Sequence, residues 1–283
     1  MGGPTAAHLL SGLTLIAQIS DPHVGTEAEA DASANALRQA VAAVGKLDPA
    51  PVAVLLTGDL TADGQPAEFE LVREILEPLA MRVHPIPGNH DRREAMRIAF
   101  EDHSGIAAAG GPLDYTVDCG PVRVVNIDTW VENQAGGAIG AERIRWIASE
   151  LMEADGRPTI LAMHHAPVGV GLDEFDAIGL AQEDRDSLRE LFERGSAPEL
   201  IVTGHIHRAA TAQIGRVPVF ICPSSHLQVE LDLRRGDKLR MSGDPPGIAL
   251  HVHGADPHLV SHVIPLPRST DATIHPSGVI SQG

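Results

Sequence analysis

Five short motifs in the sequence bring together imidazole, carboxylate and amide side chains, each beside a glycine, proline or aspartate that shapes a loop. Six of the 15 histidines fall in these motifs, which random placement explains poorly. Side chains of these types, without a thiolate, suit Mn, Fe, Co or Zn in a mixed nitrogen and oxygen shell. Seven donors exceed what one ion uses, so two ions that share a bridging carboxylate fit better. In chain order the seven candidate ligands are Asp21, His23, Asp59, Asn89, His164, His205 and His207.

A pair of metal ions supports a specific kind of chemistry. Two ions about 3.5–4 Å apart can hold both the attacking and the leaving oxygen of an in-line phosphoryl displacement, and they lower the pKa of bound water to about 7. Two divalent ions against two ligand carboxylates and one hydroxide leave a local positive charge. A small phosphate ester can therefore bind although the chain carries a net charge of −17. The residue types predict a metal-dependent hydrolase of small phosphate esters.

Short apolar runs precede all five motifs, and we interpret each run as a β-strand that ends where the motif begins. In open sheets the carboxyl ends of parallel strands form the ligand-binding edge, so the motifs should meet there. Between the first three runs, apolar residues recur at helical spacing over 27–46 and 66–79, which predicts a βαβαβ arrangement. The predicted strands span residues 14–19, 52–56, 81–86, 159–163 and 200–203.

The rest of the chain continues to alternate between helical and strand patterns, with two expected hairpins. The stretch that follows Pro167 and the charged, glycine- and proline-rich stretch 230–246 are interpreted as loops. Further strands are expected at 115–119, 122–127, 212–214, 217–222, 248–252 and 259–264, and further helices at 93–100, 141–154 and 183–193.

In order and spacing, the five motifs resemble those of the calcineurin-like metallophosphoesterases. They read Asp21-x-His23, Gly58-Asp59, Gly88-Asn89-His90-Asp91, His164-His165 and Gly204-His205-x-His207, and the resemblance spans residues 15–207. Within that superfamily, His164-His165-Ala166-Pro167 followed by residues 176–180 resembles the class III branch of cyclic-nucleotide and glycerophosphodiester phosphodiesterases. Membership implies an α/β (α+β) fold, a four-layer αββα sandwich of two mixed β-sheets flanked by helices, which agrees with the predicted strands and hairpins.

The resemblance also implies a role for each motif residue. His90, which is not a ligand in the family, would contact the phosphate and assist the leaving oxygen, with Asp91 as the residue that orients it. Asn89, His90 and His165 would face the substrate. A hydroxide that bridges the two metals would attack a small phosphodiester of the cyclic-nucleotide or glycerophosphodiester type. One metal would be held by Asp21, His23, Asp59 and His207 and the other by Asp59, Asn89, His164 and His205, with Asp59 as the bridge.

Three assignments have a structural alternative. Asp91 could instead cap the helix expected at 93–100. His165 could support the site from behind or contact the substrate, or it could be purely structural. Four histidines near the C-terminus suggest a second metal site, but no carboxylate motif frames them, so we favour a solvated face of an edge strand. These four are His251, His253, His258 and His262.

Composition restricts the partners of the chain. Aromatic residues make up only 3% of the sequence, so stacking platforms for bases are scarce, and the pI near 5.2 disfavours binding to a nucleic-acid polymer. Cys119 and Cys222 have no CxxC neighbour, which indicates buried thiols rather than a disulfide framework or a thiolate zinc site. The apolar stretch 9–19 is too short to span a bilayer, and no Lys or Arg precedes Arg38. We expect no membrane association and a cytoplasmic location.

The length of 283 residues suits one large domain with a small appendage. We expect a single metallophosphoesterase domain over 1–266, with a variable cap or tail region over about 228–266, and a flexible C-terminal tail over 267–283. A homodimer or a higher homo-oligomer is plausible from the resemblance alone. Trp130, after the strand at 122–127, could border the substrate cleft, whereas Trp146 is expected to pack along its helix.

The leading functional hypothesis is a binuclear metal-dependent phosphodiesterase for small phosphodiesters. A phosphomonoesterase or a nuclease on the same fold is the enzymatic alternative. A binding scaffold without chemistry is the third, and it predicts the loss of metal ligands, whereas all seven are present. The sequence identifies neither the metals nor the physiological substrate, because specificity in such folds depends on loops.

Overall fold

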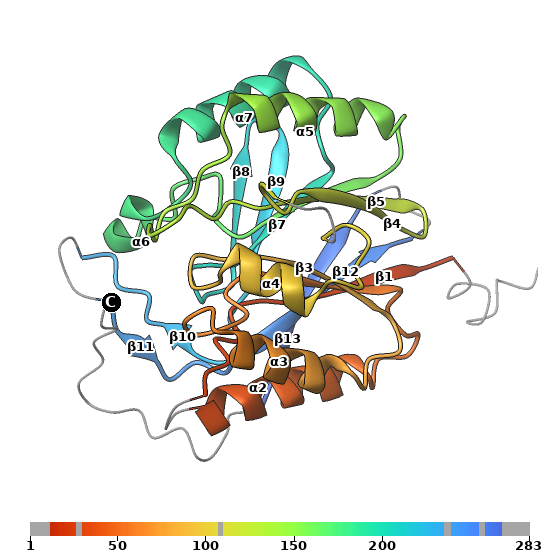
Figure 1. Cartoon of the computed structure of the whole chain (residues 1–283). Helices are drawn as coiled ribbons and strands as arrows, with labels where there is room; N and C mark the ends of the chain where they lie inside the picture. Colours follow the sequence, from red (N-terminus) through yellow and green to blue (C-terminus); the bar gives the residue numbers. More distant parts are fainter. Residues whose placement is uncertain (1–11, 27–29, 107–109, 235–238, 255–257, 268–283) are drawn as a thin grey trace, which may run out of the picture.

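The computed structural model describes residues 12–26, 30–106, 110–234, 239–254 and 258–267. Two mixed sheets lie face to face between two layers of helices (Figure 1), which confirms the predicted αββα sandwich. Helices α2 (Ala30–Val44) and α3 (Pro66–Leu76) cover the outer face of one sheet. Helices α5 (Ala141–Glu153) and α7 (Gln182–Arg194) cover the outer face of the other.

The first sheet has the strand order β13-β12-β1-β2-β3. Strands β1, β2 and β3 are parallel to one another, as the βαβαβ prediction requires. Strand β12 pairs with β1 in antiparallel register, and β13 pairs with β12 in the same way. Every residue of β1 and β2 is buried, the pattern of a strand covered on both faces. The strands are β1 (Thr14–Ile19), β2 (Ala53–Thr57), β3 (Arg82–Ile86), β12 (Gly247–His253) and β13 (Val260–Pro265).

The second sheet has the order β4-β5-β6-β7-β9-β8. Strands β5, β6, β7 and β9 are parallel, and the antiparallel β4 and β8 close the two ends as hairpin partners of β5 and β9. Both predicted hairpins are therefore present. The strands are β4 (Tyr115–Cys119), β5 (Val122–Ile127), β6 (Thr159–Met163), β7 (Leu200–Thr203), β8 (Ala210–Ile214) and β9 (Val217–Ile221).

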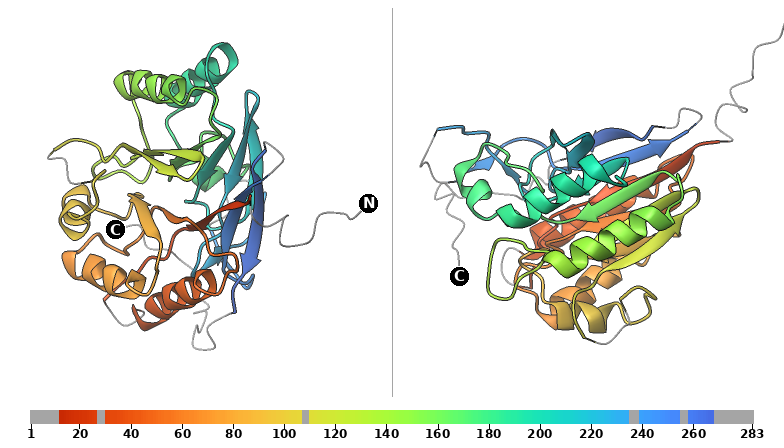
Figure 2. Two further views of the ribbon diagram at one scale, coloured as in Figure 1. Left: turned by 90° about the vertical axis from the view of Figure 1, so that its right-hand side faces the viewer. Right: turned by 90° about the horizontal axis from the view of Figure 1, so that it is seen from above.

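Two aliphatic cores hold the layers together. One joins the facing sides of the sheets to α2 and α3, and the other lies between the second sheet and the helices α5 and α7. Seen from above and from the side (Figure 2), the sheets stack between these helices along the whole molecule. Cys119 and Cys222 are buried free thiols, as predicted. None of the helices in the described part of the chain combines the length and the apolar character needed to cross a membrane.

Two regions differ from the sequence-based prediction. The loop expected after Pro167 contains a short helix, α6 (Asp173–Ala177), and the loop expected at 230–246 contributes two short paired strands, β10 (Gln228–Val229) and β11 (Met241–Ser242). Only the first part of the proposed cap region is separate from the sandwich, because β12 and β13 belong to the first sheet. The proposed tail lies outside the described residues apart from Pro267.

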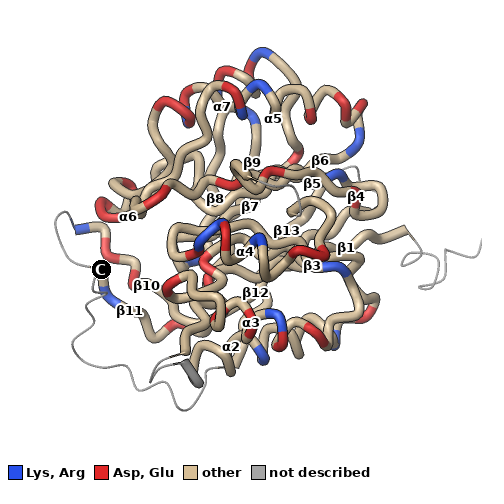
Figure 3. Tube along the Cα trace, in the orientation of Figure 1, with Lys and Arg blue, Asp and Glu red and all other residues tan. Residues whose placement is uncertain are grey.

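Helix α4 (Arg93–Ala99) follows the loop after β3, at the edge of the sandwich. Arg93 and Arg97 lie within the helix, and Arg92 comes immediately before it. Acidic residues are spread over the outer helices and over α6 (Figure 3), in keeping with the negative net charge. A local group of basic side chains therefore lies beside the loop that carries Asn89 and His90.

Candidate metal centre

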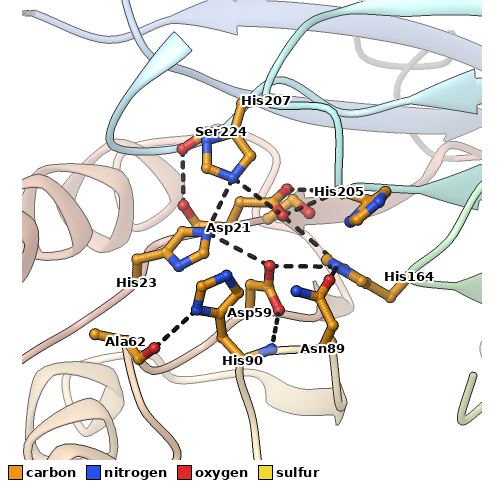
Figure 4. Close-up of polar contacts among 12 residues, drawn as sticks. Asp21, His23, Asp59, Ala62, Asn89, His90, His164, His205, His207 and Ser224 are labelled. Atoms are coloured by element: carbon orange, nitrogen blue, oxygen red, sulfur yellow. Dashed lines mark hydrogen bonds and ion pairs between the residues drawn. The ribbon is translucent and has the colours of Figure 1, made fainter. Parts of the chain in front are cut away.

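The loops that carry the five motifs converge at one edge of the sandwich (Figure 4). Backbone hydrogen bonds join them in pairs. Asp21 N donates to Gly58 O at 3.1 Å, and His23 N donates to Asp59 O at 3.0 Å. In the second sheet, Gly204 N donates to His164 O at 3.1 Å. The backbone of the protein alone therefore holds these strand ends in register.

The backbone adopts the left-handed region at most of these positions. Non-glycine residues rarely enter it, because doing so costs roughly 1–2 kcal/mol each. The interlocked loops impose this conformation, which turns side chains from different strands toward one point. Five site residues have positive φ, at values between 46° and 74°: Asp21, His23, Asp59, His205 and His207.

Glycines allow the loops to approach this closely. A Cβ atom on Gly88 would lie 2.2 Å from Asp59 Oδ1, and one on Gly58, whose φ is +91°, would lie 2.2 Å from His164 Nδ1. Neither position can accept a side chain without displacing a candidate ligand. These two glycines are therefore required by contact with a neighbouring motif.

One cluster of potential metal donors comprises Asp21, His23, Asp59 and His207. His23 Nε2 lies 2.9 Å from His207 Nε2 and 3.5 Å from Asp59 Oδ2. His207 Nε2 lies 3.7 Å from Asp21 Oδ1. Burial lowers the pKa of His23 well below its usual value and that of His207 to about 4, so both imidazoles are neutral and can offer a lone pair.

A second group of donors lies on the other side of Asp59. His164 Nε2 is 3.2 Å from Asn89 Oδ1 and 3.4 Å from Asp59 Oδ2. His205 belongs to the same histidine cluster, and its ring centroid is 5.1 Å from that of His164. The Asp59 carboxylate therefore stands between the two groups, in the position of a shared ligand.

Backbone carbonyls fix the orientation of three ligand imidazoles. His164 Nδ1 donates to Thr57 O at 2.8 Å, and His207 Nδ1 donates to Leu227 O at 2.9 Å. His205 Nε2 donates to Ile178 O at 3.1 Å. Because one ring nitrogen carries the proton that the carbonyl accepts, the other nitrogen of each ring is left to face the centre.

The donor set fits bound cations. At both sides of Asp59 the converging atoms are carboxylate oxygens, an amide oxygen and imidazole nitrogens, so a positive charge among them relieves the repulsion of their lone pairs. The pKa shifts of His164 and Asp59 also show that the carboxylates favour a positive charge beside them. Burial alone would lower the pKa of His164, yet Asp59 and Asp21 raise it to about 9. Burial would likewise raise the pKa of Asp59, but His164, His90 and His23 hold it well below its ordinary value.

His90 lies at the pocket side of the centre and is exposed. Its Nδ1 donates to Ala62 O at 2.8 Å, and its ring centroid is 4.6 Å from that of His23. The surrounding cavity wall partly desolvates the ring, which alone would lower the pKa of His90, but Asp59 and the Ala62 carbonyl raise it. With Nδ1 occupied, Nε2 is the nitrogen available to a bound molecule.

The family model described as Calcineurin-like phosphoesterase matches residues 14–209. The chain belongs to this family. A probable glycerophosphodiester phosphodiesterase GpdQ of Arcobacter nitrofigilis is 27% identical over 252 residues, which cover 88% of this chain and 92% of that protein. A cAMP/cGMP dual specificity phosphodiesterase of Mycobacterium tuberculosis is 31% identical over 221 residues, which cover 76% of this chain and 67% of that protein. The resemblance read from the five motifs is confirmed.

Solved structures show the same calcineurin-like fold. A purple acid phosphatase from yellow lupin aligns with a TM-score of 0.65 at 15% identity, over 94% of this chain and 53% of that chain. GAP50 of Plasmodium aligns with a TM-score of 0.62 at 14% identity, over 93% of this chain and 91% of that chain. At such identities the likeness concerns the fold alone.

Among the described residues, the Asp91 carboxylate makes its hydrogen bonds to groups other than the His90 ring, which differs from the orienting role expected for it. Its carboxylate is buried and accepts hydrogen bonds from Gly88 N, Leu60 N, Thr61 N and the Thr61 hydroxyl, at 2.7–3.1 Å. The carbonyl of Ala62 holds His90 instead. Nor does Asp91 cap α4, whose N-cap residue is Arg92 without a side-chain cap. Asp91 joins the loop of Asp59 to the loop of Asn89.

His165 is fully buried behind the centre, and both of its ring nitrogens are occupied by the protein. Nε2 donates to Ala135 O at 3.0 Å, and Nδ1 accepts from the Thr129 hydroxyl at 2.8 Å. Burial lowers its pKa to about 3, so the ring stays neutral. The expected contact of His165 with the substrate has no free ring nitrogen to make it, and the residue supports the neighbouring rings of His164 and His205, 4.8 and 4.5 Å away.

A cavity of about 1440 Å³ opens over the metal centre of this phosphoesterase. One wall comes from α4 and the loop after β5, and it is polar, with Arg92, Arg93 and Gln134 beside Trp130. The opposite wall comes from α6 and the β10–β11 pair and is largely apolar. Its side chains are Phe175, Ile178, Leu227, Val229, Leu239 and Met241.

His226 lines the same cavity, and sequence analysis missed it. Its Nδ1 is buried and has no hydrogen-bond partner in the described residues, and burial lowers its pKa to about 4. The signal was available, because Ser224-Ser225-His226 follow a predicted strand. Strand β9 runs parallel to β7, so its carboxyl end reaches the same edge of the sheet as His205 and His207.

The four C-terminal histidines do not form a second metal site among the described residues, but one of them was placed wrongly. His251 is fully buried on β12, which is an inner strand, and it joins Ser261 Oγ at 2.8 Å to Gln18 Oε1 at 3.0 Å. Gln18 in turn donates to Thr203 O at 3.0 Å. His251 therefore belongs to a buried polar bridge between the two sheets rather than to a solvated face.

Proposed function

We propose that this protein is a binuclear metal-dependent phosphodiesterase that hydrolyses small phosphodiesters. The observation that carries the proposal is the position of Asp59, whose carboxylate lies within 3.5 Å of donors from both ligand groups. The names of the relatives support it, since they include glycerophosphodiester and cyclic nucleotide phosphodiesterases. A cytoplasmic location and self-association stay predictions from the sequence.

The centre would hold two ions through the seven predicted ligands, with Asp59 shared. Asp21, His23 and His207 would complete one site, and Asn89, His164 and His205 the other. The identity of the ions, Mn, Fe, Zn or Co, is left open by a donor set of nitrogen and oxygen atoms. When bound, such ions lower the pKa of water and neutralise charge on phosphoryl oxygens.

The protein's own groups have distinct tasks in this proposal. His90, held by Ala62 O, presents Nε2 to the substrate, where it contacts a phosphoryl oxygen and protonates the leaving alkoxide. Asn89 lies next to it and can contact the same phosphate. Asp91 and His165 are positioning residues. Asp91 fixes the loops of Asp59 and Asn89 relative to each other, and His165 packs behind His164 and His205.

Kinetics on reconstituted protein test the proposal. Chelator-treated protein would be loaded with Mn, Fe, Zn or Co and assayed on bis(p-nitrophenyl) phosphate, p-nitrophenyl phosphate, cyclic AMP, glycerophosphocholine and single-stranded DNA. We expect activity on diesters that depends on added metal, with two ions per chain by elemental analysis. Full activity in metal-free buffer, or a preference for the monoester or for DNA, would contradict it.

A non-catalytic scaffold on the same fold gives the opposite result in the same experiment. It predicts less than one metal per chain, no turnover of any ester and no rescue by added Mn. The presence of all seven ligand side chains in two converging groups argues against it.

A further inference from the structure

Trp130 lies in the wall of the cavity above the metal centre, on the loop that follows β5. The chain has only two tryptophans, one tyrosine and five phenylalanines in 283 residues, so an indole ring at this place is conspicuous. The other tryptophan, Trp146, packs against the core between the second sheet and its helices. Large aromatic rings in binding cavities supply apolar contact area with defined geometry.

Arg93 holds the Trp130 ring in a fixed position. Its guanidinium carbon lies 4.7 Å from the ring centroid, over the face of the indole. Nε and Nη2 donate to the two carboxylate oxygens of Asp128 at 2.5 and 3.1 Å, and Nη2 also donates to Trp130 O at 2.7 Å. The guanidinium is thus committed to Asp128 and the indole rather than to a ligand anion.

Asp128 anchors this assembly to the core. Its carboxylate is fully buried and also accepts from Trp130 N at 2.9 Å and Leu113 N at 2.8 Å. Both ends of the Trp130 residue, its N–H and its carbonyl, are therefore bonded to groups that cannot move freely. A ring fixed in this way loses little further conformational freedom when a ligand stacks on it.

Two segments of the chain connect the loop of Trp130 to the candidate metal centre. Arg93 follows His90 by three residues. The guanidinium that stacks on Trp130 therefore belongs to the segment that carries the proposed proton donor. Thr129, the residue before Trp130, bonds His165 at 2.8 Å, and the His165 ring lies 4.5 Å from that of His205. Trp130 also lines the same cavity as Asp59 and His90, so a substituent of a phosphate ester bound at the centre can extend toward the ring.

Two residues with amide side chains follow Trp130 on the same loop. Asn133 and Gln134 line the cavity and are exposed. Side-chain amides can donate and accept at once, which matches the polar edges of nucleobases. A glycerol or an amino alcohol offers no aromatic face to an indole, so this wall is suited to a base rather than to an aliphatic alcohol.

We propose that Trp130 stacks against the nucleobase of the substrate and thereby makes the enzyme selective for nucleoside phosphodiesters over glycerophosphodiesters. This inference rests on the proposed phosphodiesterase function and names its substrate class. Trp130 acts as a specificity-determining residue, and Arg93 and Asp128 are positioning residues for its ring.

Steady-state kinetics on two substrates test the selectivity. For Trp130→Ala we expect the KM for cyclic AMP to rise about 5- to 100-fold, the range of base stacking on an aromatic side chain. The KM for glycerophosphocholine should stay within a factor of about two, and kcat should change little for either substrate. Trp130→Phe keeps an aromatic face and should restore most of the affinity. Trp146→Phe is the matched control and should behave as the unchanged protein does.

Fluorescence provides a readout that does not depend on turnover. In Trp146→Phe, Trp130 is the sole tryptophan, and titration with AMP should quench its emission, whereas glycerol 3-phosphate should not. In Trp130→Phe the emission comes from Trp146 and should not respond to AMP. Circular dichroism would confirm that each variant is folded.

The outcomes separate this inference from the proposed function. Equal losses on both substrates in Trp130→Ala, or no loss on either, together with unquenched Trp130, would overturn the role of Trp130 while diester hydrolysis still stands. If the unchanged protein hydrolyses no phosphodiester with any metal, the proposed function fails. In that case quenching by AMP alone would still report whether the ring binds a base.

Discussion

Two pairs of histidines in this protein meet ring nitrogen to ring nitrogen at the same distance of 2.9 Å, yet only one pair belongs to the metal centre. His23 and His207 meet at the edge of the sheets. His84 Nδ1, on β3, meets His103 Nε2, which follows α4. The comparison shows what a histidine pair needs in order to bind a metal.

The surroundings differ in the number of available carboxylates. Asp21 and Asp59 lie 3.7 and 3.5 Å from the first pair. The second pair packs against the Tyr115 ring, 4.9 Å from His103, and the nearby Asp102 is bonded to Arg73. Burial lowers the pKa of His84 and of His103, and the positive charge of Arg82 lowers both further. The carboxylates make the first pair part of a group that could hold a metal ion, whereas the second is a neutral hydrogen-bonded pair.

The largest effect should come from removing the shared carboxylate. Asp59→Asn keeps the shape of the side chain but lowers its charge, and we expect kcat/KM for bis(p-nitrophenyl) phosphate to fall about 10³-fold or more, because metal catalysis contributes several kcal/mol. Elemental analysis should show fewer than two ions per chain. Asp118→Asn, on an exposed carboxylate paired with Arg157, is the control and should keep full activity.

Metal removal should distinguish the two pairs by stability. Ligands that bind the folded state at about 1,000 times Kd stabilise it by about 4 kcal/mol, which is roughly 10 °C in Tm for a chain of this size. We expect chelation to lower the Tm of the unchanged protein and of His103→Gln by similar amounts. In His207→Ala the chelator should have a much smaller effect, and an equal shift in all three proteins would contradict the assignment.

A smaller loss of activity should follow from a substitution that displaces the Asp59 carboxylate without replacing any candidate ligand. In Gly88→Ala the new Cβ would meet Asp59 Oδ1 at 2.2 Å, so the carboxylate must shift. Because a misplacement of about 1 Å can cost 10²-fold, we expect a 10- to 100-fold drop in kcat. Gly12→Ala, whose Cβ meets no atom within 4 Å, should leave kcat unchanged. Normal kcat in Gly88→Ala would show that the loop has more freedom than the contacts allow.

The pair of His84 and His103 should make the stability of the folded protein depend on pH. Burial lowers the pKa of His84 to about 4 from 6.5, and it also lowers that of His103, so the unfolded chain binds more protons than the folded chain between these values. Stability should therefore fall as the pH drops from 6.5 to 4. Compared with the unchanged protein, His84→Gln should reduce this fall by on the order of 2 kcal/mol. Urea unfolding of both proteins with chelator present checks it, and parallel curves would refute it.

The sequence predicted the strands, and the side chains that converge at their ends, because both signals are local. A continuous apolar run such as β2 can only be a buried strand at this length, and the residues at its end follow it in space. His226 was predictable by the same reasoning, since it follows β9. The short elements α6 and β10 were missed because five and two residues are too few to show a period.

Other features depended on tertiary contacts that no local pattern encodes. The role of Asp91 depends on four donors from two loops, of which Leu60 and Thr61 are some 30 positions away. Likewise, Arg93 bonds Asp128 across 35 positions, so the fixed ring of Trp130 could not be read from either segment alone. His251 was misjudged because its partner Gln18 lies 233 positions away.

The carbonyl of Ile178 has a consequence for engineering this enzyme. Ile178 directly follows α6 and contributes to the apolar wall of the cavity. Its carbonyl also accepts a hydrogen bond from His205 Nε2 at 3.1 Å. The Leu227 carbonyl does the same for His207 beside β10. Exchanging either wall segment for that of a relative would therefore also change the orientation of a candidate metal ligand. Chimeras intended to change the substrate should retain the backbone path at Ile178 and Leu227.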